Sequence, residues 1–140
     1  MGKFSSLEIC ALSSHWSLQE RAAFAFYLEK QNLPQGEPLF FEKAAESKLY
    51  ILDSGSLKIQ TAQIELKYQP GESLGELSLL SQTEKKISAT ALSDCSFWVL
   101  TSENWKKIQD RQPLLAKLVV ESILKKMGSL MSSLPAIKSA

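Results

Sequence analysis

The spacing of apolar residues divides the chain into a helical region, a strand-rich region and a second helical region. In the first, residues 5–30, Ser5 and Ser17 are each followed three residues later by a glutamate, as in a helix capping box. The first box predicts a short helix to about Leu12, and the second predicts a longer helix to about Lys30. Pro34-Gln35-Gly36 then ends the helical region.

From residue 37 to residue 100 the apolar segments are short, and turn residues separate them at the intervals of about 8–12 residues that short strands show. Such a pattern with glycine turns is typical of an antiparallel sandwich or barrel. Segment 64–68 alternates strictly between apolar and polar residues, which predicts one buried face and one solvated face. The expected strands are 39–41, 49–52, 57–59, 64–68, 87–92 and 97–100.

After Leu100 helical patterns return, and two helices are expected over residues 102–134. Thr101 or Ser102 can cap the first helix, and Pro113 suits the first turn of the second. The second helix carries apolar residues at alternating intervals of four and three, from Ala116 onward, which is typical of a helix that meets another helix. This seam predicts a homodimer or a partner protein held through Val120, Ile123, Met127, Leu130 and Leu134. A second apolar stripe predicts that the same helix also packs on the barrel: Leu114, Leu115, Leu118, Val119 and Leu124.

Composition limits the classes of partner. The 140 residues form one domain, 1–140, and 44% of them are hydrophobic, enough to bury a core. With 16 basic and 15 acidic residues the net charge is +1, so no nucleic-acid surface is expected, and lysine pairs such as Lys125-Lys126 are interpreted as solvated edges. No apolar run approaches the ~18 residues of a membrane span. Cys10 and Cys95 lack CxxC spacing and a secretory signal, which predicts a reducing, cytoplasmic setting.

Catalytic patterns are weak throughout the sequence. His15 is the only histidine, and no residue at metal-site spacing accompanies it. A Gly-x-Ser-x-Gly nucleophile elbow does not occur. Glu72 and Glu76 stand beside glycines and are better explained as turn residues than as a carboxylate pair. We expect no enzyme activity, no metal and no required cofactor.

Residues 71–80 hold the candidate binding chemistry. Gly71 and Gly75 predict a tight turn, because glycine is used where the backbone takes a positive φ or approaches another group closely. The short apolar run that follows has room for about one helical turn, and the N–H groups at the start of such a turn suit an anion. Taken alone, this pattern is more often a plain turn between two strands.

The order of elements resembles the cyclic-nucleotide-binding domain family: helices, a glycine-punctuated β region with one short helix inside it, and two final helices. The resemblance is carried by Gly36-Glu37 with Leu39-Phe40 and by segments 49–59, 70–80 and 88–91. It implies a mainly β fold with flanking helices. That fold is an eight-stranded jelly-roll β-barrel over residues 37–100, with N-terminal helices, a short cassette helix and C-terminal helices.

The resemblance also implies a phosphate-binding cassette from Gly75 to Ala89. In the family, the glutamate that matches Glu76 accepts a hydrogen bond from the ribose 2′-hydroxyl. Backbone N–H groups around Glu76, Leu77 and Ala89 face the cyclic phosphate, as does the hydroxyl at the position of Ser88. The ligand implied is cAMP or cGMP.

One position departs from the family pattern. An arginine normally precedes the pair that matches Ser88-Ala89 and forms a two-pronged bond to the phosphate, but this sequence has Ile87 there. Lys86 is the candidate replacement. Because neighbours on a strand face opposite sides, Lys86 reaches inward only if a bulge shifts the register, and its ammonium is a point charge rather than a fork.

Three hypotheses follow from the sequence. The first is a regulatory or interaction module in which cyclic nucleotide binding is weak or lost, so that the chain acts through protein contacts or dimerisation. The alternative is a genuine cAMP or cGMP sensor with Lys86 in place of the arginine. The third is a structural subunit, or an enzyme on the same barrel, with an unrelated ligand.

Overall fold

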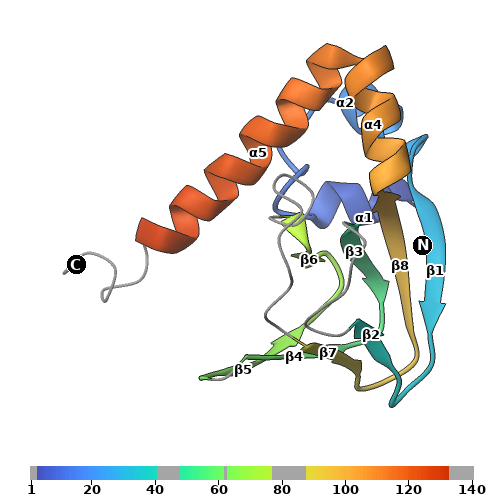
Figure 1. The fold of residues 1–140 in the computed structure, drawn as a ribbon, viewed down its shortest axis with the longest axis vertical. Coiled ribbons are helices and arrows are strands. Elements are labelled where there is room, and N and C mark those ends of the chain that lie inside the picture. Colours follow the sequence, from blue (N-terminus) through green and yellow to red (C-terminus); the bar gives the residue numbers. More distant parts are fainter. Residues whose placement is uncertain (1–2, 41–47, 62, 77–87, 133–140) are drawn as a thin grey trace.

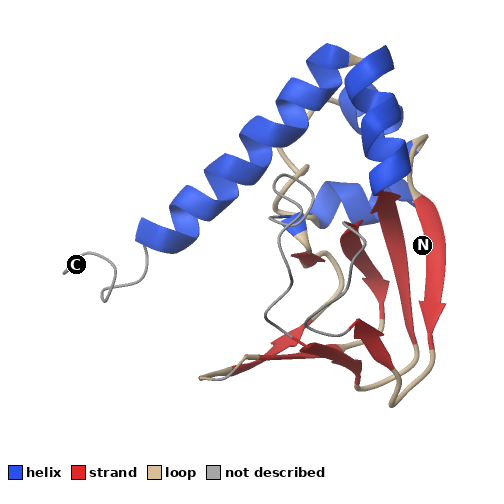
Figure 2. Cartoon of the chain, viewed as in Figure 1, coloured by secondary structure: helices blue, strands red, loops and turns tan. Residues whose placement is uncertain are grey.

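The computed structural model describes residues 3–40, 48–61, 63–76 and 88–132. Figure 1 shows a β-barrel with the helices gathered at one end, and Figure 2 shows the same separation of helices from strands. The described helices are α1 (Lys3–Ile9), α2 (Leu18–Ala25), α4 (Ser102–Arg111) and α5 (Pro113–Ser132). The described strands are β1 (Glu29–Leu33), β2 (Pro38–Phe40), β3 (Lys48–Ser54), β4 (Leu57–Gln60), β5 (Glu65–Tyr68), β6 (Ser73–Leu74), β7 (Ser88–Ala91) and β8 (Cys95–Thr101). The predicted mainly β fold with flanking helices is confirmed.

The first sheet has the order β1-β8-β3-β6 and is buried on both faces of its central strands. Leu49, Ile51 and Leu100 pack against the helices, whereas Tyr50 and Leu52 pack into the barrel interior. A strand buried on both faces needs apolar residues at consecutive positions. This explains why residues 49–52 form a continuous apolar run and do not alternate.

The second sheet has the order β2-β7-β4-β5, and its strands alternate. Leu57 and Ile59 of β4 point into the barrel, where they join Ala89 of β7, while Lys58 between them is half-buried. The edge strand β5 differs from its prediction, because Leu66 is exposed, as is Ile64 just before the strand. The expected buried face is therefore wrong. In the described part of the chain β5 pairs only with β4, so alternation alone did not place its apolar face in the core.

Two helix starts confirm their predicted caps. Glu20 N–H donates to Ser17 Oγ at 3.1 Å, and Ser17 N–H donates to Glu20 Oε1 at 2.8 Å, which completes a capping box at α2. Thr101 caps α4, because its Oγ1 accepts a hydrogen bond from Asn104 N–H at 3.1 Å. The first predicted box is wrong, because α1 begins at Lys3 and Ser5 lies inside the helix.

The helix predicted to extend to Lys30 ends instead at Ala25, and Glu29–Leu33 forms strand β1. This strand pairs antiparallel with β8 over its whole length, from Glu29 opposite Val99 to Leu33 opposite Cys95. Only Leu33 of β1 is buried, so the strand has almost no apolar signal of its own. A partner more than 60 residues away in sequence determines its conformation.

The predicted partner seam of α5 lies within the chain's own core. Ile123 is fully buried in the cluster formed by the helices and the first sheet, and Val120 and Met127 pack against that cluster. The prediction of a partner contact is therefore wrong for Ile123, whereas for the partly buried Val120 and Met127 it stays a prediction. The side chain of Leu130, and Leu134 as a whole, lie outside the described residues. Among the α5 residues whose side chains are described, the large apolar ones that are exposed are Leu114 and Leu124.

Candidate functional site

The glycine turn is formed as predicted. Gly71 and Gly75 have φ of 95° and 93°, in the left-handed region that glycine adopts readily. Gly75 directly follows β6, and Glu76 is the last residue described before residues 77–87, which lie outside the described part of the chain. Leu77, Lys86 and Ile87 also lie outside them, so the contacts predicted for these three residues stay predictions.

Ser88 and Ala89 begin strand β7 on the other sheet. Ala89 is fully buried in the barrel interior opposite Ile59, and Ser88 is half-buried opposite Gln60. The two ends of the predicted cassette are therefore held by different sheets, with Glu76 after β6 of the first sheet and Ser88 at the start of β7 of the second.

Glu76 takes part in a polar network with two residues that the sequence did not single out. Ser73 Oγ donates to Glu76 Oε2 at 2.8 Å, and Lys126 Nζ donates to Ser73 Oγ at 2.7 Å. Lys126 Nζ also forms an ion pair with Glu76 Oε2. We call this the Ser73–Glu76–Lys126 network. It connects the end of β6 directly to α5.

Lys126 was interpreted from the sequence as part of a solvated edge, and this is wrong. Its side chain is 20% exposed, and that of Glu76 is 13% exposed. One feature of the sequence could have indicated that Lys126 is buried. It follows Ile123 by three residues, residues three apart share a helix face, and Ile123 lies in the core. Its partner, 50 residues earlier in the chain, could not be read from that position.

The surroundings of the network are poorly hydrated. Cys10 is fully buried beside Ser73, and burial raises the pKa of its thiol. Burial likewise raises the pKa of the Tyr68 hydroxyl, while the positive charge of Lys126 acts in the opposite direction. An ion pair in such surroundings is less screened by water than one on an open surface.

A separate hollow of about 450 Å³ lies beside strands β1 and β8 of the first sheet. Lys30, Asn32, Ser54 and Ser96 contribute to its lining, and none of the predicted site residues does. The described residues hold no cluster of three or more histidine, cysteine, aspartate or glutamate side chains suited to a metal ion. Among the same residues, no helix is long and apolar enough to span a membrane.

Solved structures share this jelly roll with its flanking helices. A cyclic nucleotide-binding domain from Methylobacillus flagellatus superposes with a TM-score of 0.80 at 18% identity, over 93% of this chain and 79% of that one. The catabolite activator protein of Thermus thermophilus superposes with a TM-score of 0.73 at 25% identity, over 91% of this chain and 63% of that one. The fold is thus the jelly roll with flanking helices that cyclic nucleotide-binding domains have.

The chain belongs to the cyclic nucleotide-binding domain family, whose model matches residues 30–112. It is 30% identical to the cyclic AMP receptor protein of Thermus thermophilus over 96 residues. This match covers 64% of this chain and 44% of that protein. It is 24% identical over 106 residues to the cAMP-dependent protein kinase regulatory subunit of Eremothecium gossypii, covering 75% of this chain and 23% of that protein. The chain therefore spans less than half the length of these two relatives.

Proposed function

We propose that the chain is a regulatory module in which cyclic nucleotide binding is weak or lost, and which acts through contacts with other proteins or through dimerisation. The relatives named as a receptor and as a kinase regulatory subunit support a regulatory role and not a catalytic one. The observation that carries the proposal is Ile87, which stands directly before Ser88-Ala89 where the family has arginine.

The expected loss of nucleotide affinity can be estimated from the positive charge that is missing at position 87. Isoleucine has no positive group to neutralise a phosphate, and truncating one partner of a buried, hydrogen-bonded charge pair costs about 2–5 kcal/mol. This corresponds to a loss of affinity of roughly 30-fold to several-thousand-fold. A family member that binds in the low micromolar range would lose most binding by this change alone.

The test is a calorimetric titration of the chain with cAMP and with cGMP. We expect binding no tighter than the high micromolar range for the wild type, and a gain of about 30-fold or more for Ile87→Arg. Ile87→Gln is the matched control, because it supplies a long polar side chain without the charge. Low-micromolar binding by the wild type would reject the proposal.

The second candidate function is a true cAMP or cGMP sensor, favoured by the position of Lys86 next to Ile87. In that case Lys86→Ala weakens nucleotide binding, and Ile87→Arg changes it little. The same titrations therefore distinguish the two functions, because each assigns the larger effect to a different residue.

The route to a partner remains part of the proposal. Since Val120, Ile123 and Met127 pack within the chain, a protein that contacts α5 would meet its exposed side, where Leu124 lies beside Glu121 and Lys125. An apolar side chain with charged neighbours is typical of the outer part of a protein interface.

A further inference from the structure

The Ser73–Glu76–Lys126 network joins the predicted sugar site to the C-terminal helix. The Lys126 ammonium donates to Ser73 Oγ and to Glu76 Oε2, and the Ser73 hydroxyl donates to the same carboxylate oxygen. Ser73 is itself buried in β6, so its hydroxyl is held in place by the sheet. The carboxylate of Glu76 is thereby positioned from two sides.

This ion pair differs from the surface pair on α4. Lys107 and Glu103 are 3.6 Å apart, with side chains 43% and 80% exposed. In contrast, Lys126 and Glu76 are 20% and 13% exposed and share Ser73 as a third partner. Hydrogen bonds between charged groups in a poorly hydrated site are stronger and less screened than exposed ones.

The carboxylate that the resemblance assigns to a sugar is already engaged within the chain. Glu76 Oε2 accepts from Ser73 and Lys126 in this structure. Glu76 is also the residue expected to accept a hydrogen bond from a ribose 2′-hydroxyl. We propose that Lys126 is an internal competitor for the sugar site. Its ammonium holds the same carboxylate that a ribose would use, so sugar binding at Glu76 and the seating of α5 against β6 oppose each other.

This inference deepens the proposed function and rests on it. It adds a second cause of weak binding, located on α5 and independent of the residue at position 87. It also gives the ligand a mechanical effect. A nucleotide that binds Glu76 weakens the ion pair of its carboxylate with Lys126, which in the described part of the chain is the α5 residue seen to contact both Ser73 and Glu76.

The binding experiment uses the Ile87→Arg chain, in which binding is strong enough to measure. Adding Lys126→Met is expected to increase affinity for cAMP about tenfold, because the ligand no longer displaces a charge-assisted hydrogen bond. Affinity for 2′-deoxy-cAMP should stay unchanged, since that ligand lacks the 2′-hydroxyl that is expected to donate to Glu76. Lys125→Met is the matched control, as it removes the same charge from an exposed neighbouring position.

A second measurement does not depend on nucleotide. Hydrogen exchange of the α5 amides after residue 123 should become faster in Lys126→Met and in Glu76→Gln, and remain unchanged in Lys125→Met. If no variant binds nucleotide, the proposed nucleotide pocket is rejected. The exchange rates still show whether the contact between Lys126 and Glu76 holds α5 in place. Unchanged exchange, or an affinity for cAMP that falls in Lys126→Met, would overturn the inference. The second result would make Lys126 a ligand contact.

Discussion

At the residue scale, Gly55 shows how closely two turns of the barrel approach each other. It lies between β3 and β4 with φ of 92°, and a Cβ added there would stand 2.9 Å from Cys95 Sγ and closer still to the backbone oxygen of Asp94. Ser56 N–H donates to Ser93 Oγ at 3.0 Å across the same gap. A side chain at position 55 would therefore collide with the neighbouring turn, and it would also be strained by the positive φ.

Replacing Gly55 by alanine should therefore lower the free energy of unfolding by about 2–4 kcal/mol, from backbone strain and overpacking together. Gly36→Ala is the matched control, because Gly36 has φ of 87° with no atom within 4 Å of an added Cβ. It should cost only the strain of the left-handed conformation, about 1–2 kcal/mol. Urea unfolding measures both, and equal losses would show that the contact with Cys95 has no cost.

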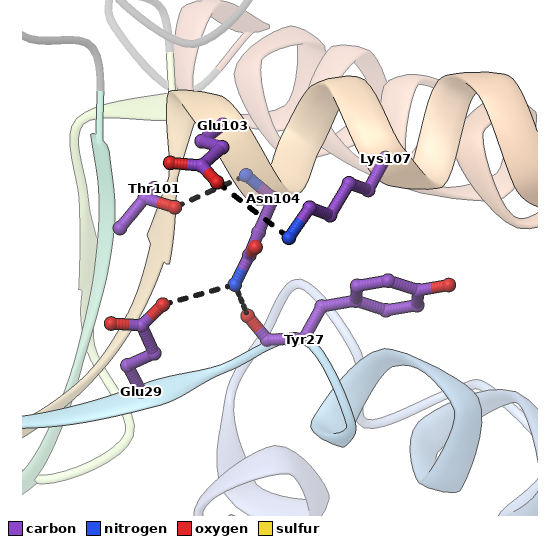
Figure 3. A network of polar contacts seen from close by, with 6 residues as sticks. All are labelled: Tyr27, Glu29, Thr101, Glu103, Asn104 and Lys107. Carbon is purple, nitrogen blue, oxygen red and sulfur yellow. Dashed lines mark hydrogen bonds and ion pairs between the residues drawn. The ribbon is translucent and has the colours of Figure 1, made fainter.

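At the scale of the element, strand β1 depends on a helix that follows it by some seventy residues in sequence. Asn104, on α4, donates its amide to Tyr27 O at 2.8 Å and to Glu29 Oε2 at 3.1 Å, just where the chain enters β1 (Figure 3). The backbone N–H of the same residue donates to Thr101 (Figure 3). Asn104 thus donates to the Thr101 cap of its own helix through its backbone and fixes the start of the strand through its side chain.

Asn104→Ala should lower the free energy of unfolding by about 1–3 kcal/mol, because the carbonyl of Tyr27 loses its donor. Asn104→Asp should be at least as damaging, since it places a carboxylate oxygen against the carbonyl and against Glu29. The control is Lys107→Met, which removes only the exposed pair with Glu103 drawn in Figure 3 and should change stability by less than about 0.5 kcal/mol. A loss in the control as large as that in Asn104→Ala would contradict the assignment.

The elements differ in how far local sequence determines them. The α2 cap, the α4 cap and the glycine turn at Gly75 were predictable, because each depends on residues within three or four positions. Strands β1 and β6 were not, since their pairing with β8 and β3 is the reason they are strands. In the site, family resemblance indicated Glu76, whereas its contact with Lys126 arises only when α5 packs on the barrel.

For the whole molecule, the first sheet separates two apolar clusters. One fills the barrel between the sheets, and the other lies between the sheet and the helices. Trp16, in the connection between α1 and α2, joins this connection to α5, as its indole N–H donates to Ser122 Oγ at 2.9 Å. A seam of apolar residues in sequence cannot indicate whether it packs within the chain or between chains. In this chain Ile123 is fully buried in the core, so this part of the seam packs within the chain.

Ile123→Ala should therefore cost about 2–5 kcal/mol of unfolding free energy at every protein concentration. Leu124→Ala, one position away on the same helix and 57% exposed, should cost less than about 1 kcal/mol. Denaturation midpoints measured at a low and a high protein concentration check both points. A wild-type midpoint that rises with concentration, or a larger loss in Leu124→Ala, would indicate that α5 is stabilised by a partner.

The course of α5 has a consequence for the transmission of a signal. The helix runs obliquely away from the barrel in Figure 1, with Ile123 anchored in the core and Lys126 three residues further on. Along a helix these residues are about 4.5 Å apart, and Ser132 is about 13.5 Å beyond Ile123. If the distal part swings about its anchor, Ser132 travels about three times as far as the lysine. The helix then acts as a lever arm, converting an ångström-scale event beside β6 into a larger displacement at the end of its described part.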